Sequence, residues 1–240
     1  PTNGASVFPY DTWARAATNV NAAMAAATSG AQVWLSNGLF FTTSTIDIPS
    51  AITVCGNGRE RTTVRRGGGV GRVFRLNHPD ALLADLAVEN GAGSGSGGNI
   101  LIDSSGGTVR RCIIRNNSAK WGGGTSKGIL VNCVLSNNRA NSDGGGAFNS
   151  KARDCTFDRN FASRDGGASD ASLVNCLVRE NAAGGDVGGT FNGSAVNCIL
   201  TKNAGGGAHG GLLVNCSIID NVLLPTSSSG SGGVYGATVV

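Results

Sequence analysis

Three aspartates that recur at a nearly constant spacing are the most regular acidic feature of this chain. Asp143, Asp165 and Asp186 lie 22 and 21 residues apart, each next to a glycine pair. If equivalent residues stack, their carboxylates form a column, and such oxygen-rich columns can hold Ca²⁺. An aspartate near glycine also forms turns through its own side chain. Because no dense acidic loop is present, the turn interpretation is favoured, and Ca²⁺ is the one cofactor left open. Nearby arginines could neutralise the column: Arg139, Arg159 and Arg164.

Basic residues near these aspartates are candidates for proton-transfer chemistry. A lyase that acts on an acidic polysaccharide needs a base and a positive charge that stabilises the developing anion. Nothing marks the basic residues as a set, and no Ser/His/Asp order, Cys/His pair or phosphate-binding loop is discernible. A carboxylate pair of a glycoside hydrolase stays open, because distances across the fold are unknown at this point. The catalytic candidates are Lys120, Lys127, Arg139 and Lys151.

A cluster of arginines is a second place for an acidic ligand. On short strands several of them would share one face and could bind an acidic polysaccharide. The alternative is a solvated basic face balanced by Asp80, Asp85 and Glu89, and this alternative is favoured because charge clusters usually need no ligand. The cluster consists of Arg59, Arg61, Arg65, Arg66, Arg72 and Arg75.

A nine-residue sequence motif, termed the phrase, occurs six times between Val109 and Asn221. It reads VRRCIIRNN, LVNCVLSNN, ARDCTFDRN, LVNCLVREN, AVNCILTKN and LVNCSIIDN. Its cysteines are Cys112, Cys133, Cys155, Cys176, Cys198 and Cys216. An asparagine follows five residues after each, at Asn117, Asn138, Asn160, Asn181, Asn203 and Asn221. A fixed period of this length indicates a solenoid, in which each repeat stacks on its neighbours.

The segments are short, rich in β-branched residues and bounded by glycine, which excludes helical repeats. Leucine-rich repeats are excluded as well, because they would carry several leucines at fixed offsets, which are absent here. The sequence therefore predicts an all-β fold, a right-handed parallel β-helix with about 21–22 residues per coil. In–out alternation predicts that Val131, Cys133 and Leu135 point into the core together, and Val174, Cys176 and Val178 likewise.

The cysteine and asparagine columns are interpreted as scaffold. Thiols that stack and point the same way are badly placed to form disulfides. Buried free cysteines pack as small hydrophobic residues, and Cys55, outside the phrase, is expected to be one more core thiol. We expect all of them to stay reduced. Asparagine amides inside a turn can hydrogen-bond along the stack, so their column needs no ligand.

The whole chain, 1–240, is predicted to form one β-helix domain. Residues 11–30 form an amphipathic helix that covers the open end, with Trp13 and Met24 on its buried side. Asp11 or Thr12 caps this helix and Gly30 stops it. Residues 31–108 form irregular coils, and residues 109–240 form the regular coils that carry the cysteine and asparagine columns. We expect the natural protein to continue beyond Val240.

Composition excludes some classes of function. The net charge is +4 and charged residues make up 14% of the chain, which gives no case for nucleic-acid binding. No apolar run approaches the ~20 residues that cross a bilayer, so this segment is not expected to insert into a membrane. The start at Pro1 is typical of a trimmed, exported protein.

Several motifs resemble those of known bacterial proteins. The opening TWARAATNVNAAMAAATSGAQVWLSNGLF, the segment ITVCGNGRERTTV and the NCxxxxN…GGGA repeats resemble large surface β-helix proteins of Verrucomicrobia and Lentisphaerae. Phe157–Asn160 and Gly144–Ala147 are similar to the FxxN and GGA motifs of chlamydial polymorphic membrane proteins. This chain departs from that type by carrying cysteine where phenylalanine is more usual. The resemblance implies the β-helix fold and export, and it assigns no reaction.

The functional hypothesis is a secreted or cell-surface β-helix module without catalytic activity, an adhesin-like or glycan-binding stalk. Its partner would be a polysaccharide or the surface of a host or neighbouring cell. The alternative is a pectate-lyase-like polysaccharide lyase or a glycoside hydrolase that acts on an acidic glycan. The oligomeric state is left open.

Overall fold

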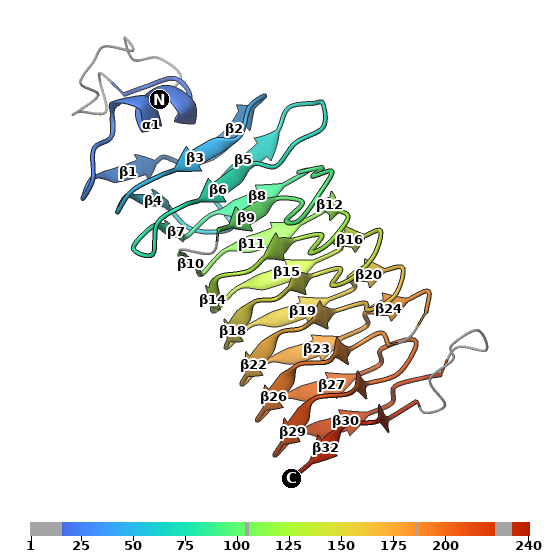
Figure 1. Ribbon diagram of the computed structural model, residues 1–240. Coiled ribbons are helices and arrows are strands. Elements are labelled where there is room, and N and C mark those ends of the chain that lie inside the picture. Colours follow the sequence, from blue (N-terminus) through green and yellow to red (C-terminus); the bar gives the residue numbers. More distant parts are fainter. Residues whose placement is uncertain (1–15, 104–105, 186, 224–231) are drawn as a thin grey trace.

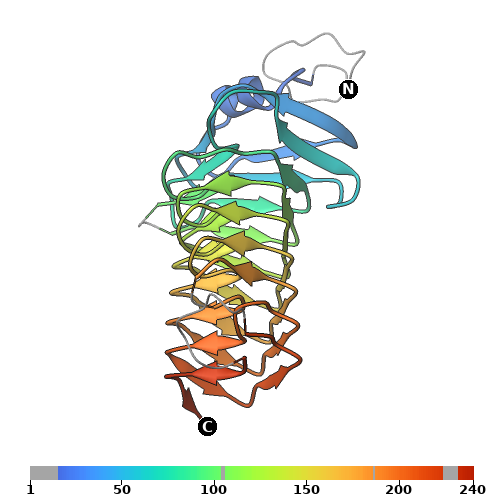
Figure 2. The ribbon, with the colours of Figure 1, turned by 90° about the vertical axis from the view of Figure 1, so that its right-hand side faces the viewer.

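The chain forms a parallel β-helix. A computed structural model describes residues 16–103, 106–185, 187–223 and 232–240. Every pairing between its named strands is parallel, and each coil lies on the previous one along a single axis (Figures 1 and 2). One sheet runs without a break from β1 to β32, so the described coils form one continuous stack. The predicted fold class is confirmed.

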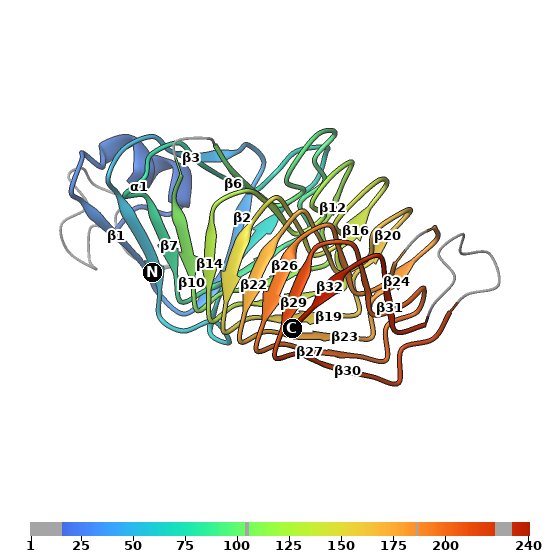
Figure 3. The same ribbon diagram turned by 60° about the horizontal axis from the view of Figure 1, so that its bottom comes forward.

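Two long sheets form adjoining sides of each coil (Figure 3). Sheet A contains β1 (Gln32–Leu35), β4 (Thr53–Gly56), β7 (Leu82–Ala84), β10 (Thr108–Arg110), β14 (Ile129–Val131), β18 (Lys151–Arg153), β22 (Ser172–Val174), β26 (Ser194–Val196), β29 (Leu212–Val214) and β32 (Thr238–Val239). Sheet B contains β2 (Gly38–Thr42), β5 (Thr62–Arg66), β8 (Ala87–Glu89), β11 (Ile113–Arg115), β15 (Val134–Ser136), β19 (Thr156–Asp158), β23 (Leu177–Arg179), β27 (Ile199–Thr201) and β30 (Ser217–Ile219).

Two further sheets complete the coil. Sheet C contains β3 (Ile46–Ile48), β6 (Phe74–Leu76), β9 (Ile100–Ile102), β13 (Thr125–Ser126), β17 (Ala147–Phe148), β21 (Ala168–Ser169), β25 (Thr190–Phe191), β28 (Ala208–His209) and β31 (Val234–Tyr235). Sheet D contains β12 (Ser118–Ala119), β16 (Arg139–Ala140), β20 (Phe161–Ala162) and β24 (Ala182–Ala183). Sheet D and the glycine-rich segments after its strands form a lobe on the side away from sheet A (Figure 3).

Residues in the left-handed conformation form the corners between sheets A and B. The residue before each cysteine of the phrase has a φ between 50° and 56°, a region that asparagine and aspartate tolerate better than most residues. Such a corner resets the in–out alternation, so Leu130 and Cys133 are buried while Val131 between them is partly exposed. The predicted inward positions of Val131 and Val174 are therefore wrong, and Leu130 and Leu173 take them.

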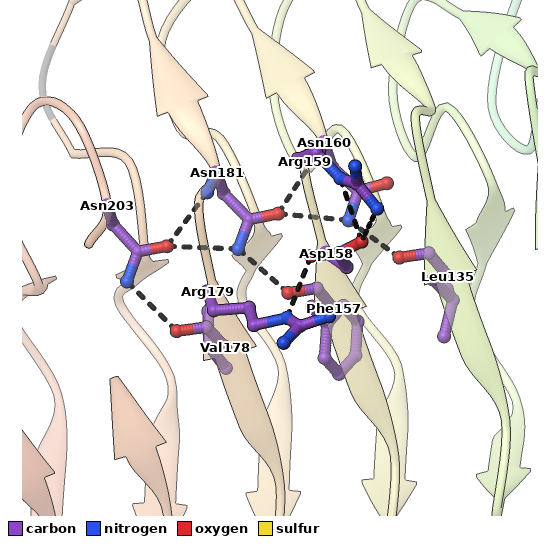
Figure 4. Close-up of polar contacts among 9 residues, drawn as sticks. All are labelled: Leu135, Phe157, Asp158, Arg159, Asn160, Val178, Arg179, Asn181 and Asn203. Atoms are coloured by element: carbon purple, nitrogen blue, oxygen red, sulfur yellow. Dashed lines mark hydrogen bonds and ion pairs between the residues drawn. The ribbon is translucent and has the colours of Figure 1, made fainter. Parts of the chain in front are cut away.

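The asparagine column forms a continuous hydrogen-bonded ladder (Figure 4). The side chain of Asn160 donates to Leu135 O at 2.9 Å and to Asn181 Oδ1 at 3.0 Å. Asn181 repeats this pattern with Phe157 O and Asn203 Oδ1, each at 3.0 Å. Because the side chains satisfy one another and the backbone in a dry corner, the scaffold interpretation of this column accounts for all of its contacts.

The six cysteines of the phrase line the core as free thiols. Each donates to the carbonyl oxygen two residues earlier, as Cys155 Sγ does to Arg153 O at 3.1 Å. Burial raises the pKa of Cys112 to about 12. A hydrogen bond with the thiol of Cys133, together with burial, raises the pKa of Cys155 to about 12. Such thiols are poor nucleophiles at neutral pH.

Thiol titration tests this arrangement. Denatured, unreduced protein is expected to show seven reactive thiols, because all seven cysteines are free. In native protein at pH 8, the five thiols of Cys112, Cys133, Cys155, Cys176 and Cys198 are expected to stay unlabelled, because each is buried. Fewer than seven thiols after denaturation would show that disulfides form and that the column is not reduced.

The helix α1 (Val20–Ala26) is shorter than the predicted range of 11–30. Asn19 has an extended backbone and its Oδ1 accepts from Ala22 N at 2.8 Å, so the helix begins after this cap. It ends at Ala26, before the expected stop at Gly30. Val20 belongs to the core, and Met24 packs against it, so the helix covers the first coil as expected (Figure 1). The predicted contact of Trp13 and the predicted caps, Asp11 and Thr12, lie outside the described residues.

Candidate functional site

The predicted catalytic residues lie on different sides of the coil. Lys120 follows β12 and its Nζ lies 4.1 Å from the centroid of the Trp121 ring. Arg139 on β16 lies over Phe161, with its Cζ 4.4 Å from the ring centroid. Lys127 occupies the corner between sheets C and A, with a φ of 64°, and Lys151 begins β18 in sheet A. The structure therefore does not bring these four residues together.

The predicted aspartate column is present in part. Asp143 and Asp165 pair across neighbouring coils, and Asp165 pairs in turn with Val187. The register therefore places Val187, and not Asp186, in the column; Asp186 itself lies outside the described residues. Arg164 Nε donates to Asp143 Oδ1 at 2.7 Å, so a guanidinium already neutralises this carboxylate. In the described part of the chain, no group of three or more His, Cys, Asp or Glu side chains is placed to hold a metal ion.

The predicted arginine cluster is spread over two sheets and a corner. Arg65 and Arg66 lie on β5 in sheet B, Arg75 lies on β6 in sheet C, and Arg59 and Arg61 lie in the loop between β4 and β5. Arg72, just before β6, donates to Ser96 O at 3.1 Å, and Arg66 donates to backbone carbonyls of residues 68, 70 and 72. The six residues therefore form no common face.

Several of these arginines join neighbouring coils through ion pairs. Arg65 Nε donates to Glu89 Oε2 at 2.9 Å, and Arg115 Nε donates to Glu89 Oε1 at 2.6 Å. Burial opposes ionisation of Glu89, but the two arginines outweigh it and lower its pKa. Arg75 pairs with Asp47 at 2.6 Å. Arg179 of the next coil pairs with Asp158 on sheet B, and the adjacent Arg159 pairs with the same carboxylate (Figure 4). These contacts neutralise Arg65 and Arg75 of the cluster without a ligand.

A groove that the sequence did not reveal lies on the outer face of sheet A. Its floor is one column of outward residues, in which Trp34 pairs with Cys55, Cys55 with Ala84, and Ala84 with Arg110. Large side chains therefore stand at both ends of the column and small ones between them. The hollow left between the ends has a volume of about 430 Å³ and is open to solvent.

A loop and a neighbouring column form the walls of this groove. Gln32, Thr53 and Leu82 line it from the parallel column of sheet A. On the other side, the loop after β4 contributes Asn57 and Gly58. Arg59 in that loop donates from Nη1 to Asn132 O at 3.3 Å, so the loop lies along the corner over several coils. The groove thus has polar walls around a partly apolar floor.

Cys55 is a free, buried thiol as predicted, but it lies outside the central hydrophobic cluster. Val54 points into the core, so the next residue on β4 points outward, onto the floor of the groove. Its Sγ lies 3.6 Å from Asp85 Oδ2. Burial, the charge of Asp85 and this hydrogen bond raise the pKa of the Cys55 thiol. The same alternation on β1 places Val33 and Leu35 in the core and exposes 57% of Trp34.

The charged residues of the groove differ in how they are paired. Arg111 Nε donates to Asp85 Oδ1 at 2.6 Å. This hydrogen bond holds the pKa of Asp85 below its usual value, although burial opposes the shift. The guanidinium of Arg110 makes no hydrogen bond or ion pair with any residue that the structure describes, and its Nε is buried. One cation therefore remains uncompensated by a direct contact at this end of the groove.

The fold defines the chain as a parallel β-helix protein, and a groove lies on the outer face of one of its sheets. No family model and no curated protein matches it. The ORF18 protein of Geobacillus virus E2 is similar, with a TM-score of 0.50 and 12% identity over 92% of this chain. The A-module of a mannuronan C-5 epimerase from Azotobacter vinelandii has a TM-score of 0.29 and 12% identity, with 92% of this chain and 94% of that module covered. This chain spans 57% of the viral protein's length. At this identity, the likeness to the viral protein shows the fold alone.

Proposed function

We propose that this chain is a glycan-binding module of an exported or cell-surface protein, which holds its ligand in the groove of sheet A without transforming it. The exposed indole of Trp34 at one end of the groove carries the proposal. An aromatic face next to hydrogen-bonding groups suits a sugar ring, which is apolar on its faces and polar at its edge. Gln32, Thr53 and Asn57 supply amide and hydroxyl groups for sugar hydroxyls.

The groups inside the groove favour binding over catalysis. General acid–base catalysis works best with a group whose pKa lies near the operating pH. The pKa of Asp85 is lowered by Arg111, and the pKa of the Cys55 thiol is raised by burial, so both are moved away from neutrality. Among the described residues, no helix is long and apolar enough to cross a membrane.

A polysaccharide panel tests the proposal. Neutral and acidic polymers are immobilised, and binding of the purified protein is measured at 150 mM salt. We expect at least one polymer to bind, and we expect Trp34→Ala to weaken that binding about tenfold or more, because a stacking contact of roughly 1.5 kcal/mol is lost. Trp121→Ala is the matched control, since this tryptophan lies on the lobe beside Lys120 and should leave binding unchanged.

Two binding results would contradict the proposal, and one activity result would contradict it as well. One is an absence of binding to every polymer in the panel, and the other is equal binding by the wild type and by a folded Trp34→Ala variant. The absorbance of an unsaturated uronate is followed in the same samples, with and without Ca²⁺. A rise in that absorbance would show lyase activity. The protein would then be an enzyme and not a binding module without catalytic activity.

A further inference from the structure

The state of Arg110 points to the chemical class of the ligand. Three outward arginines elsewhere on the solenoid, Arg65, Arg115 and Arg179, pair with carboxylates of neighbouring coils. Arg110 lines the groove without a hydrogen bond or ion pair to any described residue. Its Nε is buried, and a buried donor without an acceptor costs free energy.

The neighbouring carboxylate does not fill this role. Asp85 already accepts from both Nε and Nη2 of Arg111 and lies beside the Cys55 thiol. The charge of Arg110 lowers the pKa of Asp85 from a distance, without a contact. Counting Arg110, Arg111 and Asp85, the groove therefore carries one net positive charge, and that charge is on the guanidinium that has no partner.

We infer that the groove binds a carboxylated glycan and that Arg110 binds the carboxylate of a uronate residue. This inference rests on the proposed glycan-binding function and adds the class of glycan. A guanidinium presents two parallel N–H groups that match a carboxylate. Trp34 and Arg110 are separated by three strand spacings, about 14 Å, so the site takes an oligosaccharide, with one sugar on Trp34 and the carboxylate of another on Arg110.

The experiment compares each polymer with free carboxylates to the same polymer with esterified carboxylates. Binding of polygalacturonate, alginate and chondroitin is measured beside that of the same polymers after methyl esterification of their carboxylates. The wild type is expected to prefer a carboxylated form over its ester by about tenfold or more, as for a charge-assisted bidentate pair. Arg110→Gln is expected to bind both forms with the weaker affinity. Melting temperatures of the variants establish that they are folded.

Arg153→Gln is the matched control. Arg153 lies in the same outward column of sheet A, beyond Val131, and is not part of the groove lining. Its loss removes the same charge from the protein, so the preference for the carboxylate should survive in this variant. Equal loss in both variants would show a general electrostatic effect and would overturn the role of Arg110.

Other outcomes separate this inference from the proposed function. Wild-type binding that is indifferent to esterification would overturn the carboxylate site and leave glycan binding intact. Competition by dextran sulfate as strong as that by the free uronate polymer would show that the groove recognises charge rather than a carboxylate. Absence of all binding would remove the proposed function itself.

Discussion

Replacing Asn181 with alanine is expected to lower the free energy of unfolding by about 3–5 kcal/mol. Asn181 is fully buried in the middle of the asparagine ladder. Its Nδ2 donates to Phe157 O and to Asn203 Oδ1, and its Oδ1 accepts from the backbone and side-chain nitrogens of Asn160. Alanine removes all four hydrogen bonds. It leaves the Asn160 N–H buried without its acceptor, and water cannot replace that acceptor there.

An exposed asparagine of the same coil provides the control. Asn175 lies at a corner, donates to Asp154 Oδ1 at 3.1 Å and accepts from Asn197 Nδ2 at 3.3 Å. Its φ is 53°, so Asn175→Gly removes the side chain without straining the backbone. The expected loss is at most about 1 kcal/mol, because solvent replaces these contacts. Denaturant unfolding followed by circular dichroism measures both variants, and equal losses would refute the structural role of the buried ladder.

The regular coils could be predicted because each repeat packs against neighbours of the same kind and therefore needs the same residues at the same positions. Cys133 and Asn138 recur at equivalent positions since stacking makes every coil the environment of the next. The corners were predictable in principle as well. An asparagine or aspartate precedes most of the cysteines, at positions such as Asn132 and Asp154, and these are the residues that tolerate a positive φ. The prediction assumed that residues alternate in and out through this corner without interruption, and it therefore assigned Val131 to the core.

The groove could not be predicted because it lies in coils that lack the repeated phrase. Its floor joins Trp34, Cys55, Ala84 and Arg110, which are separated by 21, 29 and 26 residues in the chain. Loops of unequal length between these coils hide the register from any search for a fixed period. The arginine cluster shows the opposite error, because closeness in sequence placed Arg65 and Arg75 on one face. A coil turns within that distance, so they lie on sheets B and C.

Replacing Gly145 with alanine is expected to lower the free energy of unfolding by about 3 kcal/mol or more, because the solenoid has no room for a side chain at this position. A Cβ on Gly145 would lie 2.4 Å from Phe161 O and 2.6 Å from Gly166 O. Both are backbone atoms of the next coil, so neither can rotate away as a side chain would. Gly145 N also donates to Gly166 O at 2.6 Å, and a forced separation of the coils would break this hydrogen bond.

Gly95→Ala is the matched control for this steric effect. A Cβ on Gly95 would have no heavy atom within 4 Å, and its φ lies outside the left-handed region. Alanine there restricts the unfolded chain without straining the native one, so it should leave stability unchanged or raise it by about 0.4–1 kcal/mol. Thermal and denaturant unfolding of the two variants measure the contrast. If Gly145→Ala were as stable as Gly95→Ala, the coils would separate at little cost. The close contact between the coils would then not be the reason that glycine is required at position 145.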